Sequence, residues 1–284
     1  MKQSSLQDWH DWLNTPLGEY VLARERAWLD TVTPDIFGFH AIQLGCPELD
    51  LLRESRIVHR LTVAPEAVNG NEPTLRAQFH ELPFEPQSID LCVLPHVLEF
   101  NESPHEILRE IDRVMRPEGR ILIIGFNPWS LFGVKRLWAG GGRGENDGSY
   151  PWRGQFVSLI RMKDWLQLLG FEASSGKLTC YIPPCETPEW QRRYQFLERA
   201  GDRWWGVSGG VYMLEAIKRV QGARLITPKW TEQKVSERKF ATSLRREQQR
   251  EQQREQQQQR EQLRERRQQL LKNKSAENHL RLVK

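Results

Sequence analysis

The segment from Ile89 to Gly125 constrains the fold more than any other part of the sequence. Two short apolar runs, Ile89–Leu94 and Arg120–Gly125, have the composition of buried strands, and a helix is predicted between them. Ser103-Pro104 supplies an N-cap and a proline in the first helical turn, and Glu106 completes a capping box. A strand, a helix and a second strand at this spacing form a βαβ unit with parallel strands. The segment therefore predicts an α/β fold.

Further elements are predicted on both sides of this unit. The other predicted strands are His40–Gly45, Arg56–Val63, Leu75–His80, Glu172–Tyr181 and Gly210–Lys218. The other predicted helices are two within residues 6–33, divided at Thr15-Pro16, one over Met162–Leu169 closed by Gly170, and one over Glu189–Ala200. Residues 126–157 follow neither period, and a loop of that length in a compact domain is usually functional or disordered.

The positive charge of the chain is concentrated at its C-terminal end. The net charge is +4, but residues 244–284 alone contain 12 basic and 6 acidic side chains, so the first 243 residues are near-neutral. Glu-x-x-Arg pairs such as Glu247/Arg250 support a solvated helix, and a disordered tract is the other interpretation. Nucleic-acid binding is a further alternative, although the tail lacks aromatic residues and contains interleaved Glu.

Composition also excludes several classes of protein. The sequence has no run of 18 apolar residues, which excludes a membrane-spanning helix, and its first residues lack the apolar core of a secretory signal. We therefore expect a cytoplasmic protein that does not bind membranes. Cys46, Cys92, Cys180 and Cys185 form no CxxC pair and have no His at zinc spacing, so no metal site is expected. Free thiols are expected, and a pair between Cys180 and Cys185 is the alternative.

A series of motifs runs from Leu82 to Pro128. It consists of LPF at Leu82, Ile89-Asp90 leading a strand, LREIDRV from Leu108 and RPEG from Arg116. This series resembles the class I S-adenosylmethionine (SAM)-dependent methyltransferases of the ubiquinone-biosynthesis type. The segments LPHVLEF, GFNPWSL, RMKDWL and RWW further resemble a proteobacterial branch of that family with a degenerate glycine motif.

The resemblance implies an architecture and a cofactor. It implies a Rossmann-like seven-stranded, mostly parallel sheet with helices on both faces, in which Gly210–Lys218 is antiparallel. The expected domains are N-terminal helices in residues 1–38, the methyltransferase-like domain in 39–222, a linker in 223–243 and the polar tail in 244–284. The implied cofactor is SAM, bound beyond the carboxyl ends of the strands where the strand order reverses.

The first strand leads into a cofactor turn that departs from the family pattern. Gly45 and Cys46 match the start of the glycine-rich turn, whereas Pro47, Glu48 and Leu49 replace its later glycines. Proline fixes φ and bulky side chains narrow the approach, so the methionine end of SAM is expected to bind differently or weakly. An ordinary strand-to-helix turn is the alternative.

The second and third strands supply weaker matches. Ala64 occupies the position of the family's ribose-binding carboxylate, and Glu66 could reach round the turn or could be a solvated loop carboxylate. Gln78 matches the residue beside the adenine amino group, and Glu81 and Leu82 are expected to contact the cofactor through their backbone.

The fourth and fifth strands are followed by the expected reaction centre. The resemblance implies that Leu94 and Pro95 lie beside the cofactor. His96 is the candidate for an acid/base or positioning role, and Glu99 could orient its imidazole. A histidine that caps the next helix is the alternative. The predicted acceptor-site residues are Asn127, Trp129 and Tyr150, with Trp152 and Arg153 extending the same wall.

Three functions follow from these observations. The first is a SAM-dependent methyltransferase acting on a small or medium acceptor, which the sequence does not identify. The second is a methyltransferase-fold binding or scaffold protein that has lost the cofactor, because three of four cofactor positions depart from the pattern. The third is an RNA methyltransferase that uses the basic tail to bind phosphate. The tail could also mediate a protein contact.

Overall fold

The computed structural model describes residues 3–139, 150–204 and 206–219. The chain divides into two units, Met1–Val220 and Gln221–Lys284, and all described residues belong to the first. The predicted linker (223–243) and tail (244–284) lie outside the described residues. No helix among the residues described is long and apolar enough to cross a membrane.

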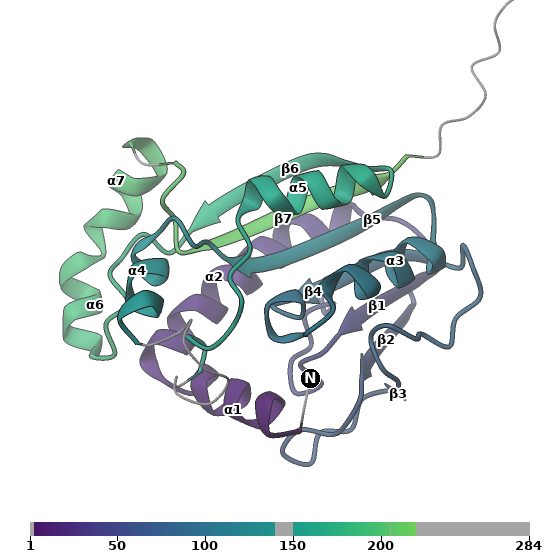
Figure 1. Ribbon diagram of the computed structural model, residues 1–284, viewed down its shortest axis with the longest axis horizontal. Coiled ribbons are helices and arrows are strands. Elements are labelled where there is room, and N and C mark those ends of the chain that lie inside the picture. Colours follow the sequence, from purple (N-terminus) through teal and green to yellow (C-terminus); the bar gives the residue numbers. More distant parts are fainter. Residues whose placement is uncertain (1–2, 140–149, 205, 220–284) are drawn as a thin grey trace, which may run out of the picture. The chain divides into compact units, whose positions relative to one another are not determined.

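The domain is built on one seven-stranded sheet with the strand order β3-β2-β1-β4-β5-β7-β6 (Figure 1). Its strands are β1 His40–Leu44, β2 His59–Ala64, β3 Leu75–Arg76, β4 Ile89–Pro95, β5 Met115–Phe126, β6 Phe171–Thr179 and β7 Val211–Lys218. The first five strands are parallel, and β7 lies antiparallel between β5 and β6. This arrangement confirms the predicted Rossmann-like sheet with its antiparallel strand.

Helices cover both faces of the sheet (Figure 1). They are α1 Gln3–Leu13, α2 Pro16–Val32, α3 Pro104–Val114, α4 Leu131–Trp138, α5 Leu159–Leu168, α6 Pro188–Tyr194 and α7 Phe196–Trp204, with short 3₁₀ turns η1 Thr33–Asp35 and η2 Leu98–Phe100. Because side chains alternate along a strand, Leu91 and Val93 pack in one core with α1 and α2, whereas Cys92 and Leu94 pack in a second core with α3 and α5.

Several predicted boundaries are confirmed and several are wrong. The break at Thr15-Pro16 and the helix end at Gly170 (φ 81°) are confirmed. However, β2 begins three residues later than predicted, β3 has two residues, and Pro117-Glu118-Gly119 belongs to β5 instead of a turn before it. The predicted single helix over Glu189–Ala200 is two helices that meet at Gln195.

Two further local predictions need correction. The capping box at Ser103 is absent, because Ser103 has φ −121° and ψ 66° and its side chain makes no capping hydrogen bond. Helix α4 was missed within residues 126–157, although Ser130 caps it by accepting a hydrogen bond from the Gly133 amide. The four cysteines are free thiols, as predicted.

The two serines provide a matched test of helix capping. Ser130→Ala removes the cap of α4 and a hydrogen bond that the hydroxyl donates to the Asn127 carbonyl, so the free energy of unfolding should fall by about 1–2 kcal/mol. Ser103→Ala removes no capping bond and should change it by less than about 0.5 kcal/mol. Equal effects of the two substitutions in denaturant unfolding would contradict this assignment.

Candidate functional site

The order of the strands reverses between β1 and β4, and both strands end at the same edge of the sheet. Parallel α/β sheets bind ligands outside the carboxyl ends of the strands at such a switch point. The segments that follow β1, β2 and β4 meet at this edge. Groups that could hold a cofactor are therefore expected at this edge.

The turn after β1 is shaped by Gln43, whose role the sequence did not reveal. The Gln43 side-chain amide donates hydrogen bonds to the carbonyls of Gly45, Cys46 and Leu49, and its oxygen accepts one from the Leu51 amide. Turns rather than a helix follow β1. Gly45 has φ 79° and Cys46 has φ 49°, so the chain reverses sharply here, in a conformation that glycine adopts most readily.

A buried ion cluster lies at the end of β4. The His96 imidazole lies between two carboxylates, with Nε2 2.7 Å from Glu25 Oε1 and Nδ1 2.8 Å from Glu99 Oε2. Each of the three residues is 2% exposed. The predicted contact between Glu99 and His96 is confirmed, and Glu99 also accepts a hydrogen bond from the Phe126 amide at the end of β5.

Glu25 is the member of this cluster that sequence reasoning missed. It comes from the middle of α2, where it shares the buried face with Val21, Trp28 and Leu29. A carboxylate at helical spacing within an apolar stripe was the signal that could have identified it, because buried charges require a partner.

The two carboxylates decide the protonation state of His96. Burial alone would lower the pKa of His96, but the charges and hydrogen bonds of Glu25 and Glu99 outweigh it and raise the pKa from 6.5 to about 9. Burial also raises the pKa of Glu99, and the imidazolium partly offsets this. At neutral pH, His96 is therefore a cation with both ring nitrogens engaged.

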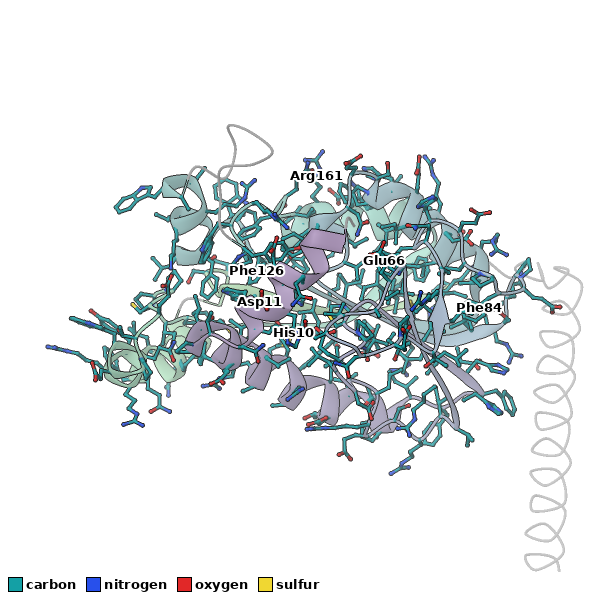
Figure 2. The ribbon with its side chains drawn as sticks, turned by 90° about the horizontal axis from the view of Figure 1, so that it is seen from below. His10, Asp11, Glu66, Phe84, Phe126 and Arg161 are labelled. Atoms are coloured by element: carbon teal, nitrogen blue, oxygen red, sulfur yellow. The ribbon has the colours of Figure 1, made fainter. Side chains whose placement is uncertain are left out.

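Helix α1 lies across the carboxyl edge and contacts the segments around it. Gln7 hydrogen-bonds Asn69 after β2, and His10 pairs with Glu48 after β1 at 3.6 Å. The Trp9 ring lies 4.8 Å from the His96 ring and 6.2 Å from the Phe126 ring. Figure 2 shows α1, with His10 and Asp11, passing over Phe126.

Two carboxylate oxygens at this edge are buried without a hydrogen-bond partner among the described residues. They are Glu48 Oε2, after β1, and Glu66 Oε2, after β2. Burial raises the pKa of the Glu48 carboxyl above its ordinary value. A buried polar group without a partner is costly, so oxygens of this kind suit hydroxyl or amino donors from a ligand. Glu66 was predicted as a cofactor residue, whereas Glu48 was considered only an obstruction.

The remaining predicted cofactor residues lie at or near the same edge. Leu94 and Pro95 are buried at the end of β4. Gln78 and Glu81 are exposed and lie on one tight turn. Phe79, on the same turn, is buried close to Gly45, because a Cβ atom on Gly45 would lie 3.7 Å from the Phe79 ring. The Leu82 amide donates to Glu110 of α3. Ala64 is fully buried and offers no side-chain acceptor.

The predicted acceptor-site residues are divided by the structure. The Asn127 amide donates to the carbonyls of Val207 and Gly209 and its oxygen accepts from the Trp129 amide, so Asn127 holds the turn after β5. Trp129 is 77% exposed and lines a groove of about 570 Å³ with His105 and Arg161. Tyr150 is buried against Phe100.

The other two wall residues also lie near α1. Trp152 is buried, with the Lys135 ammonium over its ring at 4.8 Å. Arg153 pairs with Asp8 of α1 at 2.8 Å and covers the Tyr150 ring. These residues lie on the α1 side of the edge, whereas Trp129 lines the groove on the α3 and α5 side.

Comparison with known proteins agrees with this geometry. Residues 50–123 match the family model of the methyltransferase domain. Over these residues the chain is similar to methyltransferase domains. The match covers strands β2 to β4, helix α3 and most of β5, and it begins after the Gly45–Leu49 turn.

Individual relatives share parts of this domain. The chain is 33% identical over 163 residues to the uncharacterized protein YafS of Escherichia coli (strain K12), over 57% of this chain and 64% of that protein. It is 32% identical over 91 residues to a malonyl-[acyl-carrier protein] O-methyltransferase of Halorhodospira halophila, over 29% of this chain and 31% of that protein. The chain thus spans less than two thirds of the length of these curated relatives.

Two of the similar solved structures have low sequence identity to this chain. A SAM-dependent methyltransferase from Archaeoglobus fulgidus is 18% identical, covering 70% of this chain and 94% of that chain with a TM-score of 0.48. A methyltransferase from Mesorhizobium loti is 14% identical, covering 67% and 96% with a TM-score of 0.46.

The charge state of His96 predicts a pH-dependent stability. The pKa of His96 is about 9 in the folded protein, compared with an ordinary value of 6.5. The contribution of its charge to the free energy of unfolding is therefore complete below pH 6.5 and is lost as the pH rises towards 9. His96→Gln should lower the free energy of unfolding by about 3–5 kcal/mol near pH 6.5, and the difference from wild type should shrink by about pH 8.5.

Denaturant unfolding across this pH range measures the effect. His80→Gln, at an exposed histidine, is the matched control and should leave the free energy of unfolding unchanged at each pH. A difference between wild type and His96→Gln that stays constant with pH would contradict the assignment of an imidazolium.

Proposed function

We propose that this domain is a SAM-dependent methyltransferase that acts on a small-molecule acceptor. The observation that carries the proposal is the pair of buried, unpartnered carboxylate oxygens of Glu48 and Glu66 at the switch point. SAM carries ribose hydroxyls and an α-amino group, which can donate hydrogen bonds to these two oxygens. Glu48, three residues after Gly45, and Glu66, two residues after Ala64, would thus replace the cofactor contacts that the degenerate glycine turn and Ala64 do not supply.

The residues that would hold SAM come from two loops, the one after β1 and the one after β2. Glu66 would accept from the ribose hydroxyls, Glu48 from the α-amino group, and Gly45 lets the backbone approach the cofactor. When bound, SAM supplies an electrophilic methyl group on a sulfonium. The protein's part is to position donor and acceptor and to exclude water, and the burial of the His96 cluster beneath α1 serves the second purpose.

In this mechanism His96 is a positioning residue rather than the acceptor's general base. Both its nitrogens are engaged by carboxylates, so it has no free lone pair for a proton from the acceptor. The cluster also fixes the end of β4 to α2 and β5.

The groove beside Trp129 is the proposed approach for the acceptor. It lies beside the segments that follow β4 and β5, and its lining includes Arg136, Arg161 and Glu102 together with His105. The Arg161 guanidinium lies over the Trp165 ring at 5.4 Å. Cations next to aromatic faces suit an acceptor that combines a negative charge with an apolar body.

A cofactor-free binding protein is the second candidate. Ala64 lacks the usual ribose acceptor, and α1 covers the edge where the cofactor would enter. The two candidates differ in one property, namely whether the chain binds SAM at all. The RNA methyltransferase alternative depends on the tail, which lies outside the described residues.

Calorimetry with S-adenosylhomocysteine separates these candidates. Wild type should bind, and Glu66→Gln should weaken binding about tenfold, or about 1.4 kcal/mol, because a charged acceptor of a hydrogen bond is lost. Glu85→Gln, at an exposed glutamate on a neighbouring loop, is the matched control and should bind as wild type does. No binding by wild type at millimolar ligand would reject the enzyme and favour the cofactor-free protein.

A further inference from the structure

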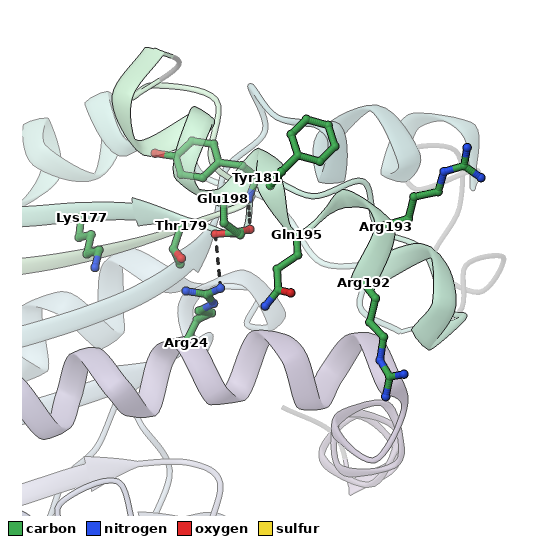
Figure 3. A pocket seen from close by; sticks show the side chains of 9 residues that line it. Arg24, Lys177, Thr179, Tyr181, Arg192, Arg193, Gln195 and Glu198 are labelled. Carbon is green, nitrogen blue, oxygen red and sulfur yellow. Dashed lines mark hydrogen bonds and ion pairs between the residues drawn. The ribbon is translucent and has the colours of Figure 1, made fainter.

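A second cavity lies at the opposite end of the carboxyl edge, away from the candidate methyltransferase site. It has a volume of about 650 Å³ and is lined by α2, the end of β6 and the α6–α7 pair (Figure 3). Four strand spacings separate β6 from β1, which corresponds to about 19 Å across the sheet. This cavity therefore cannot be an extension of the turn after β1.

The lining of this cavity is strongly basic. Arg24 comes from α2, Lys177 from β6, and Arg192 and Arg193 from α6. In Figure 3 the Arg193 head group points away from the others, whereas Lys177, Arg24 and Arg192 follow one another along the cavity. Lys177, Arg24 and Arg192 are therefore the cations placed along one side of the cavity.

The carboxylate in the cavity lining is already engaged. Glu198 Oε1 accepts hydrogen bonds from the backbone amides of Tyr181 and Ile182 and from the Tyr20 hydroxyl. Its other oxygen lies 4.0 Å from Arg24, a pair that Figure 3 marks. Glu198 thus anchors α7 to α2 and to the end of β6, and can offset the charge of only one neighbouring cation.

Lys177 and Arg192 have no acidic partner within the described part of the chain. Both are exposed, and they project into the same cavity from separate elements. The Thr179 hydroxyl and the Gln195 amide, which also line it, add polar groups between the cations. Uncompensated cations around a concave volume of this size favour a multiply charged anion.

We propose that this cavity binds the phosphoryl group of a small soluble ligand. A phosphoryl group presents several charged oxygens. The planar guanidinium of an arginine can bind two of these oxygens at once, whereas a lysine ammonium acts as a single point charge. Lys177 and Arg192 contact the anion from opposite sides, and Gln195 and Thr179 donate between them. The proposal does not depend on methyl transfer, because none of these residues belongs to the SAM site.

Inorganic pyrophosphate is a direct probe for the full-length protein. Wild type should bind it in calorimetry, with an affinity that falls as salt is added. Lys177→Gln and Arg192→Gln should each weaken binding about tenfold, whereas Arg192→Lys, which keeps the charge, should weaken it less. Arg109→Gln makes the same charge change at an exposed site on α3 and should have no effect.

Other outcomes would overturn the proposal. Absence of binding by wild type, or an equal loss in Arg109→Gln and the cavity variants, would do so. Vesicles of phosphatidylcholine with phosphatidylglycerol test a lipid headgroup as the source of phosphate. Cavity-dependent vesicle binding without pyrophosphate binding would reject a soluble ligand. Unchanged S-adenosylhomocysteine binding by Lys177→Gln and Arg192→Gln, measured in parallel, keeps this result separate from the proposed methyltransferase function.

Discussion

The buried contact of His96 with Glu25 and Glu99 is the interaction on which the arrangement of the carboxyl edge depends. It joins α2 to the end of β4, and the hydrogen bond from the Phe126 amide to Glu99 extends it to the end of β5. Removing one partner would leave a buried charge uncompensated, which is more costly than losing a surface ion pair. This contact fixes α2 against the sheet. Helix α1 precedes α2 by a short turn and lies over the same edge.

The placement of α1 determines what the domain can do. Its residues contact the segments after β1 and β2, and its tryptophans pack on His96 and Phe126. A ligand at the switch point would lie beneath this helix and out of bulk water. In such a site, a carboxylate such as Glu66 interacts with a bound donor more strongly than it would on an open loop.

The sequence predicted the sheet well because each central strand is a short apolar run and α3 has a clear periodic face. It predicted Glu99 beside His96 because the two are three residues apart. The apolar stripe of α2 could have indicated that Glu25 is buried, but not that its partner is His96, 71 residues away, nor that the Gln43 side chain shapes the turn after β1. These contacts depend on tertiary packing, which local spacing does not encode. The site roles of the other predicted residues, including Gln78 and Trp129, remain predictions.

We propose that SAM binds at the switch point beneath α1, and amide hydrogen exchange with and without S-adenosylhomocysteine measures where the ligand binds. Ligand bound there should slow exchange in residues 44–49, 64–68 and 96–99 and in α1, with little change in the helices around Arg192. Unchanged exchange in those segments at saturating ligand, or protection confined to residues 188–204, would contradict the account.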